Sequence, residues 1–140
     1  MKILIQKIHP DTKLPTHAHA TDAGMDMYAC ERIIVPAHGR VRIYHGFALL
    51  IPPGYVGLVK DKSSISNAGL HQIGGVFDAG YTGEYNTQLV NLTNAEYIFE
   101  KGDKVSQLVI VPLASYECEV VDALPETSRG DGAFGSTGKQ

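Results

Sequence analysis

Apolar and polar residues alternate along much of this chain, and a period of two is typical of β-strands that bury one face. The alternation runs through "ILIQKI", "GRVRIYHGFALLI", "GYVGLVK" and "VSQLVIVPL", which are rich in Val, Ile and Tyr. Turn clusters such as "PAHG", "PPG", "DAG" and "KGD" separate these runs at a spacing of about 8 to 12 residues. The pattern predicts an all-β fold, a jelly-roll-like sandwich or barrel.

One short helix is expected within this β pattern, at "SSISNAG". Ser63 or Ser64 is suited to cap its start, and Gly69 is suited to end it.

The apolar pattern stops after "ECEVVDALPETS", so we place the end of the folded body near Asp122. This divides the chain into a β domain, residues 1–122, and a C-terminal arm, residues 123–140. The arm ends in "RGDGAFGSTGKQ", and glycine loses more backbone freedom on ordering than any other residue. We therefore expect a flexible arm that becomes ordered only when a ligand contributes binding energy.

Composition narrows the classes of function. A chain of 140 residues with 44% hydrophobic and 19% charged residues corresponds to one globular domain. The net charge of -3 and the lack of a basic run argue against a nucleic-acid partner, because such binding needs clustered Lys and Arg.

Several further features favour a cytoplasmic protein. No apolar stretch approaches the about 18 residues of a membrane span, so no membrane partner is expected. The start, "MKILIQKIHP", lacks the pattern of an export signal. Cys30 and Cys118 lie far apart and form no CxxC pair, which favours reduced thiols over a disulfide.

Two familiar short motifs in the arm do not fit the chain. "RGD" resembles an integrin-binding tripeptide, but a chain without an export signal would not meet an integrin. "GSTGK" resembles a phosphate-binding P-loop, but Ala133 stands where that motif needs its first glycine, and no helix follows Lys139.

A third interpretation of the arm uses phosphate chemistry without a helix. Glycine N–H groups, the Ser136 and Thr137 hydroxyls and the Arg129 guanidinium can wrap a polyphosphate. Phe134 can stack on a base, which contributes about 1–3 kcal/mol and is too little to order the arm alone. The arm is therefore expected to close on a triphosphate-like ligand.

Five stretches together resemble the homotrimeric dUTP diphosphatase family. In chain order they are "DAGMDMYA" (22–29), "DKSSISNAG" (61–69), "GGVFDAGYTGEY" (74–85), "GDKVSQLVIVP" (102–112) and "RGDGAFGSTG" (129–138). The resemblance implies Mg²⁺-dependent hydrolysis of dUTP to dUMP and pyrophosphate, which keeps uracil out of DNA and supplies dUMP for thymidylate synthesis. It also implies a jelly roll, a homotrimer, and an arm that closes over the active site of a neighbouring subunit.

The resemblance assigns the nucleoside end of the site to one hairpin, residues 74–81. Asp78 matches the carboxylate that activates the attacking water, and Tyr81 matches the ring that lies under the deoxyribose and excludes a 2′-hydroxyl. Backbone groups of this hairpin would read uracil, and Gly75 fits such a close approach.

The resemblance assigns the phosphate end to several other segments. Asp26 matches a carboxylate that supports the water shell of the metal. Residues that match contacts to the nucleotide, most of them to its phosphates, are Lys62, Ser63, Ser64, Gln107, Arg129, Phe134, Gly135, Ser136 and Thr137.

The sequence departs from the family pattern at a few positions. The family usually has Arg at the position of Lys62, and Lys keeps the charge but loses bidentate geometry toward phosphate. An acidic and a basic residue are usual where Gly80 and Thr82 stand, and Gly is usual at the position of Ala133.

Two other functions stay open at this point. One is the related dCTP deaminase group, which shares the jelly roll and needs a hairpin glutamate, for which Glu84 is the candidate. The other is a nucleotide-gated regulatory protein that keeps the pocket but turns over slowly.

Overall fold

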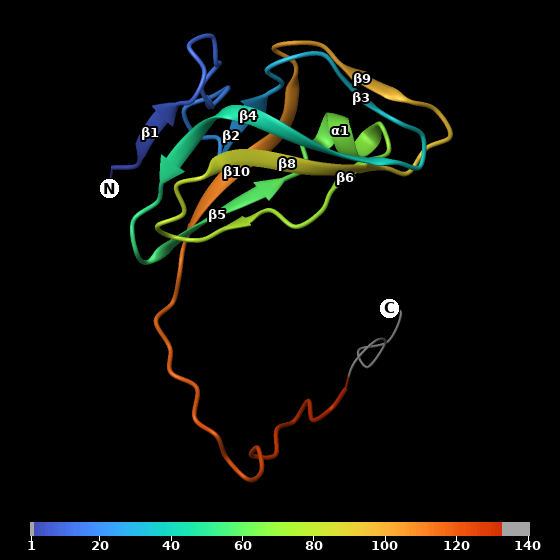
Figure 1. The fold of residues 1–140 in the computed structure, drawn as a ribbon. Helices are drawn as coiled ribbons and strands as arrows, with labels where there is room; N and C mark the ends of the chain where they lie inside the picture. Colours follow the sequence, from blue (N-terminus) through green and yellow to red (C-terminus); the bar gives the residue numbers. More distant parts are fainter. Residues whose placement is uncertain (1, 133–140) are drawn as a thin grey trace.

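Two antiparallel four-stranded sheets form the body of the protein (Figure 1). The structure, a computed structural model, describes residues 2–132. One sheet has the order β1 (Leu4–Lys7), β4 (Arg40–Leu50), β8 (Glu84–Asn91) and β6 (Leu70–Gln72). The other has the order β2 (Gly24–Tyr28), β10 (Lys104–Pro112), β5 (Tyr55–Lys60) and β7 (Val76–Phe77). With β3 (Ile33–Val35), β9 (Tyr97–Phe99) and the short helix α1 (Ser63–Asn67), the elements confirm the predicted all-β fold.

The main core lies between the two sheets. In β8 every second residue is buried, as the period of two requires. Tyr85 of β8 stacks on Phe77 of β7 with ring centroids 4.2 Å apart, and on Phe47 of β4 at 5.6 Å. These rings join strands of both sheets, so the turn that follows β7 starts from a rigid base. The expected hairpin is not a paired one, because β7 pairs with β5 and β8 lies in the other sheet; we keep the name hairpin for residues 74–81.

A second core cluster holds α1. Ile65, the buried residue of α1, packs with Leu70, Leu89 and Phe99. The expected end of the helix is confirmed, because Gly69 directly follows the C-cap and has a φ of 83°. The expected serine cap is wrong: Lys62 takes the N-cap position with extended backbone and no capping side-chain hydrogen bond. Both serines lie inside the first turn and are exposed.

A bulge interrupts β4 opposite the start of β8, with a register shift between Tyr44 and Ala48. Gly46 sits in this bulge with a φ of 72°, and a Cβ there would lie 2.2 Å from Thr12 Oγ1. The Gly46 N–H donates to Glu84 Oε1 at 2.7 Å. Glu84 thereby fixes the bulge.

A buried row of polar groups crosses the sandwich next to the bulge. His45 Nδ1 lies 2.8 Å from the Tyr28 carbonyl oxygen, and His45 Nε2 lies 2.8 Å from Thr87 Oγ1. Because a carbonyl only accepts, Nδ1 donates, and Nε2 of the neutral ring accepts from Thr87. Ser106 Oγ follows 2.6 Å from Thr87 Oγ1. Burial lowers the pKa of His45 to about 4, so the ring is neutral at physiological pH.

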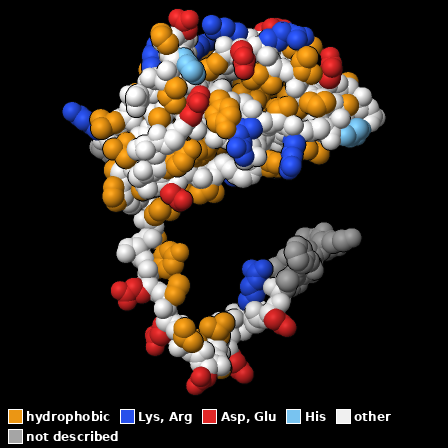
Figure 2. All heavy atoms as spheres, in the orientation of Figure 1, with side chains coloured by type: hydrophobic (Ala, Val, Ile, Leu, Met, Phe, Trp, Pro, Cys, Tyr) orange, Lys and Arg blue, Asp and Glu red, His pale blue; other side chains and the backbone are white. Residues whose placement is uncertain are grey.

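Beyond β10 the chain leaves the body as an extended arm (Figure 1). Apolar side chains stand exposed along it, among them Tyr116 at 82%, Val120 at 97% and Leu124 at 85% exposure (Figure 2). The last strand ends at Pro112, upstream of the boundary that the sequence pattern placed near Asp122. Over residues 2–132, no helix has the length and apolar character needed to cross a membrane.

Candidate active site

Three of the predicted site residues line one pocket beside β7. This pocket of about 280 Å³, the hairpin pocket, brings together Gly75, Asp78 and Tyr81. Its other lining residues are Arg42, Gln72, Ile73, Val76, Phe77, Asn86 and Gln88. Amide side chains and backbone therefore line a pocket that also includes the exposed residue Asp78, a setting suited to a polar ring such as a nucleobase.

Glycine is required where the hairpin begins. Gly75 has a φ of 84°, and a Cβ there would lie 2.3 Å from Gln72 Nε2 and 3.0 Å from the Val59 carbonyl oxygen. The Val59 N–H donates to the Gly75 carbonyl oxygen at 2.8 Å, which ties this backbone to β5. The pocket wall at Gly75 is thus bare backbone.

Asp78 and Tyr81 are placed by a tight turn at the hairpin tip. The Tyr81 N–H donates to the Asp78 carbonyl oxygen at 3.2 Å, and Gly80 between them has a φ of 82°. The Tyr81 ring lies 5.5 Å from Phe77 and 6.0 Å from Tyr85, so the aromatic row of the core continues to the surface. Tyr81 is 41% exposed and offers a ring face that is held from behind.

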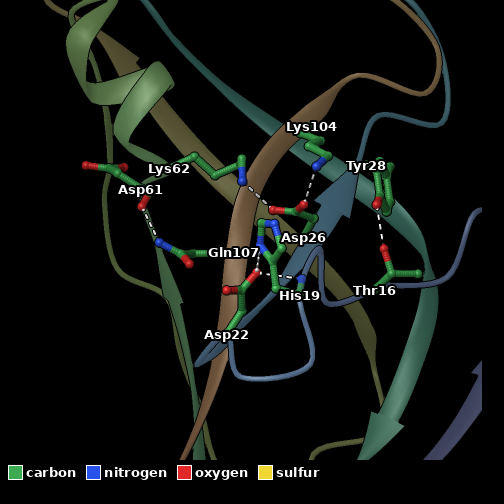
Figure 3. Close-up of polar contacts among 9 residues, drawn as sticks. All are labelled: Thr16, His19, Asp22, Asp26, Tyr28, Asp61, Lys62, Lys104 and Gln107. Atoms are coloured by element: carbon green, nitrogen blue, oxygen red, sulfur yellow. Dashed lines mark hydrogen bonds and ion pairs between the residues drawn. The ribbon is translucent and has the colours of Figure 1, made fainter.

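A second group of predicted residues gathers where β2, β10 and the start of α1 meet (Figure 3). Asp26 is only 4% exposed, and Lys62 Nζ donates to its Oδ1. Lys104 Nζ lies 2.6 Å from Asp26 Oδ2, within ion-pair distance but outside hydrogen-bond geometry. We call these three residues the charge cluster.

The charge cluster keeps Asp26 ionised. Burial raises the pKa of Asp26, but the Lys104 and Lys62 ammonium groups together outweigh it, so the pKa lies below its ordinary value. Contact with the same carboxylate raises the pKa of Lys104. Two cations thus share one carboxylate, so the charge cluster by itself carries one net positive charge.

Gln107 joins this group from β10. It stands opposite Asp26 in the β2–β10 register, and its Nε2 donates to the Asp61 carbonyl oxygen at 2.8 Å (Figure 3). Ser63 and Ser64 follow Lys62 directly in the chain, with exposed side chains. The structure therefore brings Gln107 to the turn that carries Lys62 and both serines.

Sequence reasoning assigned no contact to Asp61 and no ion pair to Lys104, although both stand inside recognised stretches. For Asp61 the available signal was its place next to Lys62, an expected ligand residue. The partners themselves, Gln107 for Asp61 and Asp26 for Lys104, are distant in sequence.

Within the described residues, Arg129 of the arm is hydrogen-bonded inside the arm and to neither group. Arg129 is exposed, and its Nε donates to the Gly132 carbonyl oxygen at 3.2 Å within the arm itself. The predicted contacts of Phe134, Gly135, Ser136 and Thr137 lie outside the described residues.

The side chains around Asp26 suit a magnesium ion that is bound to the phosphates of a triphosphate better than one that is bound by protein groups alone. Residues 2–132 contain no group of three or more His, Cys, Asp or Glu side chains placed to hold a metal. The buried Asp26 carboxylate is engaged by both lysines, so a metal-bound water would compete with two ammonium groups for its oxygens. Mg²⁺ commonly binds through substrate phosphates and keeps several waters, which agrees with this donor set.

Comparison with known proteins settles the family. Residues 11–138 match the sequence model of the dUTPase family. The chain belongs to the dUTPase family. The match includes the hairpin pocket, the charge cluster and the predicted residues of the arm.

Individual dUTPases resemble the chain over almost its whole length. The deoxyuridine 5'-triphosphate nucleotidohydrolase of Paramecium bursaria Chlorella virus 1 is 34% identical over 97% of each chain. The structure of the Staphylococcus bacteriophage 80alpha dUTPase with dUPNHPP has a TM-score of 0.90 and 27% identity, covering 98% of each chain. A mutant dUTPase from phage phi11 of S. aureus has a TM-score of 0.81 and 25% identity, covering 90% of this chain and 100% of that one. That mutant is described as revealing the coordination of a structural Mg(II) ion.

Proposed function

We propose that this protein hydrolyses dUTP to dUMP and pyrophosphate, with the hairpin pocket as the deoxyuridine site. The observation that carries the proposal is that Asp78 and Tyr81 share one pocket in a chain of the dUTPase family. The reaction keeps uracil out of DNA and supplies dUMP for thymidylate synthesis. We place it in the cytoplasm.

The chemical step is an in-line displacement at the α-phosphorus. Asp78 takes a proton from a water molecule as the water oxygen bonds to the α-phosphorus. The bond from the α-phosphorus to the bridging oxygen breaks, and pyrophosphate leaves with the bonding electrons. General base catalysis contributes about 10²–10⁴-fold, so phosphate binding and charge neutralisation must supply the rest.

Charge neutralisation falls to the charge cluster, the start of α1 and the arm. Lys62 leaves Asp26 to reach the phosphates, and Lys104 stays to balance the buried carboxylate. Ser63, Ser64 and Gln107 donate hydrogen bonds, and Arg129 comes with the arm. Mg²⁺ bound to the triphosphate neutralises part of its negative charge.

Selectivity comes from shape at the hairpin. The Tyr81 ring, backed by Phe77 and Tyr85, cannot retreat from a ribose 2′-hydroxyl. Burial of one methyl group discriminates by only about 1–3 kcal/mol, so the hairpin backbone must in addition exclude the thymine methyl group by shape.

A homotrimer would complete the site. Residues 113–132 extend from the body and expose apolar side chains, which a second copy of the chain would cover (Figure 2). In such an assembly the arm of one subunit closes over the nucleotide of a neighbour. Size-exclusion chromatography with light scattering tests the expected threefold mass.

The test of function is product analysis with dUTP, dTTP, dCTP and UTP side by side in the presence of Mg²⁺. Release of pyrophosphate from dUTP alone is expected. Asp78→Asn should still bind dUTP but turn over at least about a hundredfold more slowly. Asp11→Asn, at an exposed carboxylate outside the hairpin pocket, is the matched control and should be as active as the wild type. Normal turnover by Asp78→Asn would refute the role of the base.

The same assay separates the two alternatives. Glu84 offers no proton-transfer group to the hairpin pocket, because its carboxylate accepts from Gly46 and the residue lines a different pocket of about 690 Å³. Conversion of dCTP to dUTP would nevertheless establish the deaminase. Saturable dUTP binding without pyrophosphate release would establish the regulatory protein.

A further inference from the structure

Asp61 makes three hydrogen-bonding contacts at the end of β5, directly before Lys62. Its Oδ1 accepts from the Gln72 backbone N–H at 2.6 Å, and its Oδ2 lies 2.6 Å from His71 Nδ1. Its carbonyl oxygen accepts from Gln107 Nε2 at 2.8 Å. The side chain is 17% exposed, so solvent reaches it poorly. Asp61 therefore ties the turn before α1 to β6 on one side and to β10 on the other.

The contact with Gln107 orients an amide. With one N–H committed to the Asp61 carbonyl, Gln107 Nε2 keeps a second N–H for another acceptor. The amide is also confined by Gly24, where a Cβ would lie 2.4 Å from Gln107 Oε1. A shift of the Asp61 backbone would turn this amide.

The carboxylate fixes that backbone. Hydrogen bonds to an ionised acceptor are shorter and stronger than neutral ones, and the 2.6 Å contact to the Gln72 N–H belongs to this class. No side-chain cap hydrogen bond holds the start of α1, whereas the Asp61 carboxylate ties the turn before the helix to two residues of β6.

We propose that Asp61 is a positioning residue for triphosphate binding: it holds Lys62, the following serines and the Gln107 amide in one arrangement. The proposal rests on the proposed function, in which these groups bind the phosphates. It assigns Asp61 no contact with the nucleotide. Small errors of placement are costly in such sites, since a shift of about 1 Å can cost about a hundredfold in rate.

The test compares a ligand that needs the phosphate groups with one that does not. Asp61→Ala should weaken binding of the non-hydrolysable analogue dUpNHpp at least about tenfold, and binding of deoxyuridine by less than about threefold. His71→Ala is the matched control, because it removes only the exposed partner of the carboxylate; it should stay within about threefold of the wild type for both ligands. Asp61→Asn keeps an acceptor for the Gln72 N–H and should recover most of the dUpNHpp affinity.

A merely structural role would give a different pattern. Equal losses for dUpNHpp and deoxyuridine, or unchanged affinity for both, would overturn the proposal. Should Asp61→Ala fail to fold by circular dichroism, Asp61→Glu keeps the charge but moves it by one methylene, and the same selective loss is expected. A wild-type protein that binds dUpNHpp without hydrolysing dUTP would refute the proposed function alone, and a wild type that binds neither ligand refutes both.

Discussion

His45 should make the stability of this protein depend steeply on pH in the mildly acidic range. The ring is fully buried and hydrogen-bonded at both nitrogens, to the Tyr28 carbonyl and the Thr87 hydroxyl. A protonated ring would have to keep its charge away from water and would lose the hydrogen bond that Nε2 accepts. Replacing His45 by Gln keeps one donor and one acceptor but removes the titration.

The size of this pH effect on the free energy of unfolding follows from the pKa of His45. Burial lowers the pKa of His45 from its ordinary 6.5 to about 4, so the unfolded chain binds a proton in this range and the folded chain does not. The contribution of neutral His45 to the free energy of unfolding is complete above pH 6.5 and is lost as pH falls toward about 4. The loss is about 1.4 kcal/mol per pH unit, or about 3 kcal/mol in all. Asp26 acts in a lower window, because its pKa lies below 3.8 in the folded protein.

Urea unfolding at fixed protein concentration, from about pH 4.5 to 7.5, measures this effect. Wild-type protein should lose about 2–3 kcal/mol of its free energy of unfolding between about pH 6.5 and 4.5. His45→Gln should show a slope shallower by about 1 kcal/mol per pH unit in that window. His17→Gln, at an exposed histidine, is the control and should follow the wild type. Parallel profiles for His45→Gln and wild type would refute the assignment of the pH dependence to this ring.

Two further changes test the hairpin and the arm. Gly75→Ala should lower kcat/KM for dUTP at least about tenfold more than Gly74→Ala. Both substitutions cost about 1–2 kcal/mol because φ is positive, but only a Cβ at Gly75 would collide with Gln72 and Val59. Equal losses of kcat/KM in steady-state assays would show that the space at Gly75 is irrelevant. Deleting the residues after Ser128 should abolish most dUTP hydrolysis. Light scattering and circular dichroism should show that the oligomer stays folded. Normal hydrolysis by the shortened chain would exclude the role of the arm as a lid.

Local features of the site could be read from the sequence. Asp78 and Tyr81 stand in a single tight turn, where the chain connectivity itself keeps them close. Gly69 and Gly75 were also recognisable, because a positive φ is a local demand that favours glycine. The serine cap was wrong because Lys62 already adopts the N-cap backbone, which leaves both serines within the helix.

Contacts between distant segments could not be read in the same way. The sequence places Lys62 and Lys104 in separate stretches, and only the order of the sheet β2–β10–β5–β7 brings both to Asp26. The contacts of Asp61 with Gln107 and of His45 with Thr87 likewise join residues far apart in the chain.

The sequence by itself determined the strands, the turns and the closeness of Asp78 to Tyr81, because alternation, glycine conformation and tight-turn spacing act over a few residues. The tertiary structure decided which charges pair and which polar groups are buried. Those outcomes depend on strand order and register, and the energy of a buried ion or imidazole depends on every element packed around it.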